Sequence, residues 1–405
     1  MPGAAVQTIS TSCVISGGGP AGLMCGYLLA RAGVDVTVLE KHADFLRDFR
    51  GDTVHPSTMQ VLHEVGLLER FLQLPHAKIR QVTLDFGDRR YAIGDFARLN
   101  TQAKFIALMP QWDFLNFIAS EAKQYPHFRL LMQTESRDLL SRNGRICGVL
   151  ACGTDGNMQI RAGLTIAADG RHSRLRDRSG LPLKEIGAPF DVLWLRLPWR
   201  DGDPVDLVGR VTGEAFFVMI WRGDYWQCAY GIPKGGFDAL KAEGIPGFRA
   251  RLKKVAGFAA GRVDTITGFD QVRLLTVAVN RLERWARPGL LCIGDAAHAM
   301  SPAGGVGINL AIQDAVAAAN ILGPLLARGV PGLADLKKVQ ARRMLPTRIV
   351  QAAQVVAQNT LLAPVLASGE APSAPWPVKL LDRCPRLRGI PARLIGIGPR
   401  PEHIR

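Results

Sequence analysis

Residues 14–40 read VISGGGPAGLMCGYLLARAGVDVTVLE, which is the pattern of a strand, a glycine turn, a helix, a turn and a second strand. Gly17, Gly19 and Gly22 fill the glycine positions of G-x-G-x-x-G, which allow a tight turn, close approach to a pyrophosphate and close packing of the helix on the strand. The helix directs its positive end at the phosphates. Glu40 ends the second strand where a carboxylate that binds ribose hydroxyls is expected. The stretch predicts an adenine dinucleotide site and leaves NAD and FAD open.

The composition is that of a globular protein with two or more domains. The chain has 405 residues, of which 47% are hydrophobic and 21% charged. We find no signal-peptide pattern and no run of about 18 apolar residues, so neither secretion nor a membrane span is expected. The seven cysteines are scattered without a C-x-x-C pair. This spacing argues against a metal site and favours a reducing, cytoplasmic location.

The net charge of +15 leaves several interpretations open. Nucleic-acid binding is disfavoured, because the basic residues are not interleaved with aromatic ones and no nucleic-acid module is recognisable. From Arg342 onward ten Lys and Arg face three Asp and Glu. We therefore predict a basic helical region over 341–405 that contacts an anionic membrane surface or an acidic partner. A solvated basic surface is the simplest alternative.

The order of patterns predicts an α/β fold with an inserted sheet. Alternating apolar residues dominate 79–106 and 181–279, where they predict an antiparallel-sheet, substrate-binding domain. A Rossmann-like domain with a parallel sheet is predicted to be discontinuous over 1–78, 107–180 and 280–340. An apolar, aromatic face of the inserted sheet is a candidate wall for a hydrophobic ligand. Its candidate residues are Trp194, Arg196, Met219, Trp221 and Tyr230.

Two further motifs follow apolar strands. Asp169-Gly170 ends one strand, and a carboxylate at such a strand end is a common ligand position in open α/β sheets. Gly294-Asp295 ends another strand, and a glycine-rich loop over 302–307 then leads into a long helix from about Val306. The start of this helix favours negative charge on a ligand.

In this order the three motifs resemble those of the FAD-dependent monooxygenases of the p-hydroxybenzoate hydroxylase type, the class A flavoprotein aromatic hydroxylases. The resemblance covers about residues 10–330, and RGDTVHPSTMQVL (50–62) and MPQWDFL (109–115) share it. It implies bound FAD, NADPH or NADH as a transient electron donor, and O₂ as co-substrate. It also implies hydroxylation of an aromatic or other hydrophobic small molecule through a flavin C4a-hydroperoxide, by a monomer or homodimer.

The resemblance also implies roles for single residues. The backbone of Pro302 and Gly307 lies at the reactive edge of the flavin, with no side-chain acid or base assigned, and the helix start is expected to stabilise the anionic reduced flavin. His172 and Arg176 match positions that hold NADPH. The cofactor contacts are assigned to Gly17, Gly19, Pro20, Ala21, Gly22, Glu40, Lys41, Arg50, Gln111, Asp169, Gly294, Asp295, Pro302, Gly305, Gly307, Ile308 and Asn309.

Two other functions fit the same motifs. An FAD-dependent reductase or dehydrogenase of an isoprenoid-like substrate would transfer hydride without consuming O₂. A non-catalytic FAD-binding redox protein would use the basic tail to recruit a partner. A flavin halogenase is disfavoured, because its W-x-W-x-I-P signature is missing.

Overall fold

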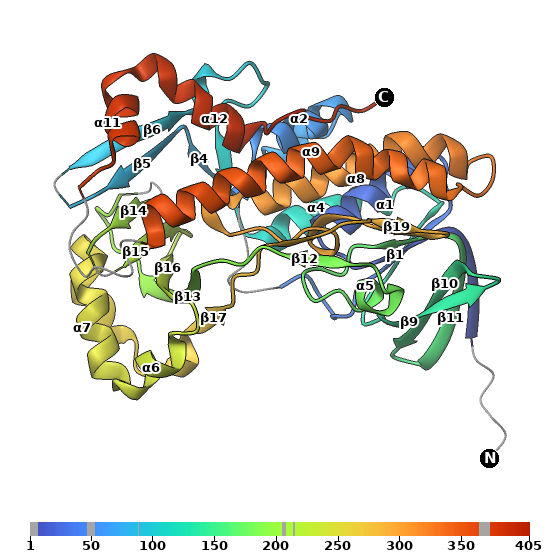
Figure 1. Cartoon of the computed structure of the whole chain (residues 1–405), viewed down its shortest axis with the longest axis horizontal. Coiled ribbons are helices and arrows are strands. Elements are labelled where there is room, and N and C mark those ends of the chain that lie inside the picture. Colours follow the sequence, from blue (N-terminus) through green and yellow to red (C-terminus); the bar gives the residue numbers. More distant parts are fainter. Residues whose placement is uncertain (1–6, 47–52, 88, 205–207, 214, 364–372) are drawn as a thin grey trace.

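Two β-sheets and the helices around them make up the fold (Figure 1). The larger sheet lies on one side of the molecule and the smaller, antiparallel sheet on the other, with helix α9 (Leu333–Ala357) running from the first part toward the second. The computed structural model describes residues 7–46, 53–87, 89–204, 208–213, 215–363 and 373–405.

Among the described residues, eight strands form the larger sheet. Its order is β19 (Ala286–Arg287), β20 (Leu290–Cys292), β11 (Gly156–Ala167), β1 (Gln7–Ser16), β2 (Val36–Leu39) and β8 (Phe128–Leu131), with β10 (Arg145–Gly153) and β9 (Glu135–Arg142) attached beside β11. The strands from β20 to β8 pair in parallel. All of β2 and the end of β1 are buried, as a parallel sheet covered on both faces requires.

The opening stretch folds as its sequence predicts. Helix α1 (Pro20–Arg31) connects β1 to β2, and Gly33 follows it with a φ of +79°, a conformation that glycine adopts without strain. The other helices of this part are α2 (Pro56–Glu64), α3 (Leu68–Phe71), α4 (Gln111–Ala122), α5 (Arg174–Ser179) and α8 (Val306–Leu326). A small three-stranded sheet has the order β3 (Thr53–Val54), β7 (Ile106–Leu108) and β4 (Ala77–Ile79). A separate two-stranded sheet pairs β12 (Leu183–Glu185) with β18 (Asn280–Leu282).

The smaller sheet has two packed faces. Its order is β17 (Arg273–Leu275), β13 (Phe190–Pro198), β16 (Tyr225–Pro233), β15 (Phe216–Trp221), β14 (Val208–Val211), β5 (Gln81–Asp85) and β6 (Arg90–Asp95). One face packs against α7 (Gly244–Ala256), and the other packs against β7 and the segment 277–279. The sequence predicted strands and turns throughout this region and missed both α7 and α6 (Phe237–Ala242).

The basic C-terminal region is helical, but its predicted start at 341 falls inside α9. Leu336, Val339 and Val350 of α9 are buried, so this helix continues the core of the larger part. Beyond it, α11 (Trp376–Arg383) and α12 (Gly389–Gly396) lie over β6 (Figure 1).

The segment Ala303–Leu326, most of it α8, is long and apolar enough to cross a membrane. Asn309, Gln313 and Asp314 interrupt the segment, so it is not an unbroken apolar run. The most apolar window of the segment is 72% buried inside the protein, where α8 packs against α1 and α9. We therefore assign α8 to the core of the fold.

Candidate functional site

The glycine turn between β1 and α1 leaves no room for side chains on its inner side. A Cβ atom added to Gly17 would lie 2.3 Å from the carbonyl oxygen of Ala168, and one added to Gly22 would lie 1.9 Å from the carbonyl oxygen of Gly17. Gly19 precedes α1 and faces open space, and no side chain caps the helix. The free N–H groups at the start of α1 therefore fit a pyrophosphate.

Glu40 lies beside this turn at the end of β2. One carboxylate oxygen accepts the Gly18 N–H at 3.1 Å and the other accepts the His42 N–H at 3.0 Å. The side chain is thereby fixed against the glycines, as a ribose-binding carboxylate requires. Lys41, also assigned to the cofactor, is exposed. Arg50 lies outside the described residues.

Asp169 follows β11 and also borders the glycine turn, since a Cβ on Gly17 would lie 2.9 Å from the Asp169 Cα. Its carboxylate accepts hydrogen bonds from the Ser173 hydroxyl at 2.5 Å and the Leu175 N–H at 3.2 Å. Burial raises the pKa of this carboxyl group. Both oxygens are thus used to hold the start of α5, which makes Asp169 a support of the turn.

The two residues assigned to NAD(P)H lie in different environments. His172 is exposed, whereas Arg176 is buried and its guanidinium Nε contacts Asp177 at 3.1 Å. The Nη1 atom of Arg176 is buried without a hydrogen-bond partner among the described residues. The pKa of the Cys292 thiol is raised by burial and, to a smaller extent, by the charge of Asp169, and Arg176 acts in the opposite direction. Arg176 therefore belongs to the interior around Asp169.

Gly294 packs directly on the first motif. A Cβ on Gly294 would lie 3.0 Å from the Ala21 Cβ, so the two glycine motifs meet although the sequence separates them widely. Gly294 has a φ of +59° and donates its N–H to Asp314 at 3.0 Å. Asp295 is half-buried in the same turn, and Pro20 begins the neighbouring helix.

The glycine-rich loop leads into α8 through two residues with positive φ, Gly304 (+78°) and Gly305 (+65°). No side chain caps α8, so its first N–H groups are available to a ligand. The Asn309 Oδ1 atom accepts hydrogen bonds from Ser57 and, at 3.1 Å, from Thr58, which ties α8 to α2. The structure thus groups the loop residues that were assigned to the flavin, namely Pro302, Gly305, Gly307, Ile308 and Asn309.

Gln111 is buried at the first position of α4, where the sequence placed it. Its helix starts directly after β7, the strand that pairs with β3 and β4. Its contact with the cofactor stays a prediction.

The five candidate substrate residues divide between the two faces of the smaller sheet. Trp194 and Arg196 point toward the β7 side, whereas Met219, Trp221 and Tyr230 belong to the cluster packed on α7. Met219 and Tyr230 are fully covered there, with Tyr230 contacting Phe217 and Phe248 edge-on. These three residues therefore do not share a wall with Trp194, and we leave them out of the substrate site.

The β7-facing side carries buried polar groups that the sequence did not single out. The Trp194 Nε1 and Gln227 Nε2 atoms are buried without hydrogen-bond partners in the described part of the chain. Register places Gln227 opposite Arg196, on the face that Trp194 occupies. A separate groove of about 480 Å³ at the edge of this sheet is lined by Arg196, Tyr225 and Arg273, among others, and its lining does not include Trp194 or Gln227. The guanidinium of Arg196 lies over the Tyr225 ring, 4.7 Å from its centroid.

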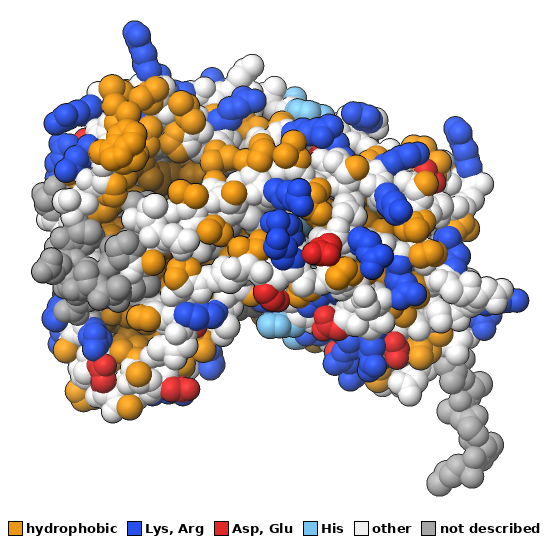
Figure 2. Space-filling view, in the orientation of Figure 1, with side chains coloured by type: hydrophobic (Ala, Val, Ile, Leu, Met, Phe, Trp, Pro, Cys, Tyr) orange, Lys and Arg blue, Asp and Glu red, His pale blue; other side chains and the backbone are white. Residues whose placement is uncertain are grey.

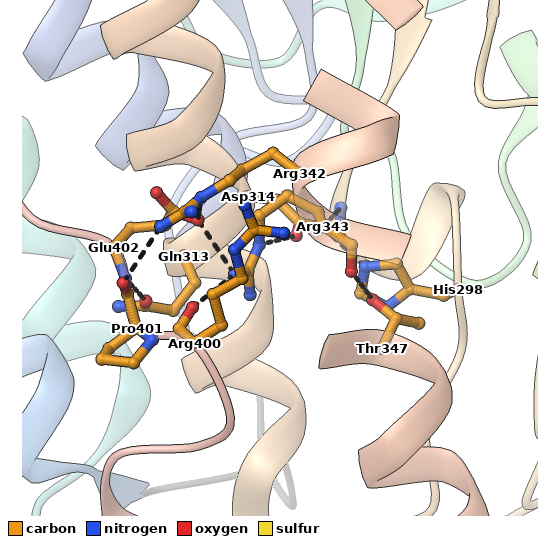
Figure 3. A network of polar contacts seen from close by, with 10 residues as sticks. His298, Gln313, Asp314, Arg342, Arg343, Thr347, Arg400, Pro401 and Glu402 are labelled. Atoms are coloured by element: carbon orange, nitrogen blue, oxygen red, sulfur yellow. Dashed lines mark hydrogen bonds and ion pairs between the residues drawn. The ribbon is translucent and has the colours of Figure 1, made fainter. Parts of the chain in front are cut away.

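A second group that sequence reasoning missed surrounds Asp314 in α8 (Figure 3). The carboxylate binds His298 Nε2 at 2.6 Å and Arg343 Nε at 3.1 Å, and all three side chains are buried. Burial opposes ionisation of Asp314, but the charges and hydrogen bonds of His298 and Arg343 keep its pKa below the ordinary value. One signal was available, because His298 lies three residues after Asp295 in the same motif.

Comparison with known proteins places this site in a family. Residues 10–353 match the family described as "FAD binding domain". The match covers most of the chain, which therefore belongs to this family of FAD-binding proteins. The glycine turns and free helix starts described above fit its cofactor.

Particular relatives define the reaction. The chain is 32% identical over 384 residues to 6-methylpretetramide 4-monooxygenase of Streptomyces rimosus, covering 94% of this chain and 91% of that protein. Para-nitrophenol 4-monooxygenase of a Pseudomonas species is 24% identical over 78% of both chains. The solved structure of p-nitrophenol 4-monooxygenase from Pseudomonas putida shares the fold, with a TM-score of 0.77, 20% identity, and coverage of 96% of this chain and 97% of that one.

The protein is thus an FAD-dependent monooxygenase of the aromatic hydroxylase type, with NAD(P)H and O₂ as co-substrates. The comparisons support this reaction over the reductase and the non-catalytic redox protein that the motifs left open.

Proposed function

We propose that this monooxygenase hydroxylates a multi-ring aromatic substrate of the tetracycline-precursor type. The observation that carries the proposal is the 32% identity, over nearly the whole chain, to the enzyme named for 6-methylpretetramide. A second relative, 26% identical, is named for anhydrotetracycline and 12-dehydrotetracycline.

The wall of the smaller sheet supports a substrate that is apolar and carries oxygen acceptors. Phe190, Val192 and Ile220 form an apolar surface on the face of Trp194. The unpaired N–H groups of Trp194 and Gln227 lie within it, and a buried donor without a partner costs about 1–3 kcal/mol. A keto or phenolic oxygen of the substrate would satisfy these donors and fix which ring carbon faces the cofactor.

The chain's own residues hold, orient and shield the reacting groups. When bound, FAD takes a hydride from NAD(P)H and activates O₂. The glycine turn and Glu40 would hold the adenosine half of the cofactor, and the Gly294-Asp295 turn would hold its middle. The free N–H groups at the start of α8 stabilise negative charge beside the glycine-rich loop. The apolar wall around Trp194 excludes water.

A substrate panel tests the proposal directly. The purified enzyme with FAD is supplied with NADPH or NADH and with 6-methylpretetramide, anhydrotetracycline or p-nitrophenol. We expect the two multi-ring compounds to stimulate O₂ consumption and to gain one oxygen atom by mass spectrometry. Equal or greater stimulation by p-nitrophenol would refute the multi-ring assignment.

A tryptophan pair tests the proposed wall. Trp194→Phe keeps an aromatic side chain but removes the five-membered ring with the N–H that has no partner among the described residues, so KM for the substrate should rise about tenfold with FAD binding unchanged. Trp199→Phe is the matched control, because Trp199 also has an unpaired indole N–H but packs beside Trp221 in the cluster on α7. An equal change of KM in both variants would remove Trp194 from the substrate site.

We also propose that the basic C-terminal region docks on anionic membrane, where an apolar substrate concentrates. Trp376, Leu380 and Ile390 expose 75%, 40% and 67% of their surfaces. Figure 2 shows hydrophobic side chains gathered over the position of α11, bordered by Lys and Arg. The exposed basic residues of α11, of α12 and of the segment between them include Lys379, Arg383, Arg386 and Arg393. Apolar anchors inside a cationic rim suit an anionic lipid surface.

Vesicle co-sedimentation checks this contact. The wild-type protein should bind phosphatidylglycerol-rich vesicles and not pure phosphatidylcholine, with binding weakened by salt. The double variant W376S/L380S should lose most of the binding. Val330→Ser, an equally exposed apolar residue in the turn before α9, is the control that should keep it. Binding that is equal on both vesicle types would overturn the electrostatic part of the proposal.

A further inference from the structure

A series of buried polar groups connects the Gly294-Asp295 turn to the far end of the described chain (Figure 3). Asp314 accepts the Gly294 N–H at 3.0 Å through one oxygen and the Arg343 Nε–H at 3.1 Å through the other. Arg343, on α9, extends its Nη1 to a Glu402 carboxylate oxygen at 3.2 Å. Asp314, Arg343 and Glu402 are 0%, 2% and 5% exposed, so no solvent screens this series.

The segment around Glu402 is held by side chains from three helices. Arg342 of α9 donates to the Glu402 carboxylate at 2.7 Å, and Gln313 of α8 accepts the Glu402 backbone N–H. Glu64 of α2 binds the His403 ring at 2.6 Å and the Ile404 N–H at 2.8 Å. The segment 400–405 is therefore docked across α2, α8 and α9.

A second series of contacts runs from α12 to the glycine-rich loop. The His55 Nδ1 atom lies 2.8 Å from the Ile395 carbonyl oxygen, and its Nε2 atom lies 3.2 Å from the Thr53 hydroxyl. That hydroxyl lies 3.2 Å from the Gly305 carbonyl oxygen. Burial lowers the pKa of His55 to about 4, so the ring is neutral and Nδ1–H donates to Ile395.

We propose that the segment 389–405 positions both FAD-binding loops, and that Glu402 is a positioning residue for the Gly294-Asp295 turn. It acts through Arg343 and Asp314 and does not itself contact the cofactor. The inference rests on the FAD binding of the family and is independent of the proposed substrate.

The physical reason is the burial of the Arg343 guanidinium between two carboxylates. If Glu402 loses its charge, Asp314 is the one anionic partner left to Arg343 among the described residues, and the other acceptors, the Arg400 carbonyl oxygen and the side-chain oxygen at position 402, are neutral. A buried cation that loses an anionic partner is costly, so Arg343 moves toward Asp314 or toward water. Either movement shifts the position of the Asp314 carboxylate, which accepts the Gly294 N–H. The turn that binds the cofactor then loses its fixed position.

Flavin titration of apo-protein made from full-length variants tests the proposal. Glu402→Gln should raise the Kd for FAD about tenfold, and Glu402→Asp, which keeps the charge, should recover most of the loss. Glu64→Gln is the matched control, because it loosens His403 and Ile404 without touching Asp314 or Arg343. Its Kd should stay within about twofold of the wild-type value. The visible circular dichroism of bound FAD should change only in Glu402→Gln.

The second series has its own variant. Thr53→Val keeps the shape of the side chain and removes the hydroxyl between His55 and Gly305, and it should raise the Kd for FAD about threefold. The proposal is overturned if Glu402→Gln and Glu64→Gln weaken FAD equally, in proportion to their losses of Tm. It is also overturned if Glu402→Gln and Thr53→Val both leave the Kd unchanged, whether or not any substrate stimulates NAD(P)H oxidation.

Discussion

Two buried carboxylate–arginine clusters lie in the two halves of this protein and do different things. In the sheet domain, Asp203 binds both Nη atoms of Arg262 and also accepts the Trp226 Nε1–H at 3.2 Å. In the nucleotide-binding domain, Asp314 binds Arg343 and His298. The Asp314 cluster is fully buried and Asp203 is half-buried, and in both clusters the partners lower the pKa of the carboxyl group.

The difference lies in what each carboxylate holds next. In addition to the hydrogen bonds from Arg262 and Trp226, Asp203 accepts the Arg200 N–H at 3.0 Å, in a turn after the end of β13. Asp314 accepts the N–H of Gly294, in the turn that packs on the first glycine motif. The same chemistry therefore fixes a surface turn in one half and a cofactor-binding turn in the other. We expect only the Asp314 cluster to couple stability to FAD affinity.

The largest effect is expected from Asp314→Ala. The substitution leaves the Arg343 guanidinium and the His298 ring buried without their shared acceptor, and breaking such a pair costs about 3–5 kcal/mol. Urea unfolding at a fixed FAD concentration measures the loss of stability. Flavin content after purification should fall as well. A variant that is destabilised but retains its full flavin content would show that Asp314 does not position the cofactor-binding turn.

Asp203→Ala should cost less, about 2–3 kcal/mol, because the Asp203 side chain is 9% exposed whereas that of Asp314 is fully buried, so water can reach Arg262 once the carboxylate is gone. The loss should appear in urea unfolding, while the Kd for FAD stays at the wild-type value. A weakened Kd here would show that any buried charge defect disturbs the cofactor, and the contrast between the two clusters would disappear.

The nucleotide-binding half was predictable where its signals are local. A single turn requires the three glycines Gly17, Gly19 and Gly22 within a few residues of one another. The apolar run of β2 follows after one helix. Helix α7 was missed because Gly244 and Pro246 lie in its first turn, and these residues normally end helices. Helix α6 has only six residues, too few for a helical repeat to show in the sequence.

The features that the sequence did not predict depend on contacts between residues far apart in the chain. Glu402 meets Arg343 from 59 positions away and Asp169 meets Gly17 through a parallel sheet, and no pattern in the sequence records either contact. Alternation in β15 predicted two faces correctly, but both faces are buried. Sequence alone therefore could not decide whether Met219 or its neighbour Ile220 lies on the face of Trp194.

The smallest effect concerns acid. Hydrogen bonds from Arg262 lower the pKa of Asp203 from the ordinary 3.8 to about 2. A lowered folded-state pKa contributes stability above the ordinary value and loses it as pH falls from about 4 toward 2. Asp203→Asn lacks this contribution at every pH, so the stability gap between wild type and variant should narrow from pH 6 to pH 3. Urea midpoints of the two proteins, compared at the same pH, measure the gap. A constant gap would mean that Asp203 stabilises the turn through its shape and not through its charge.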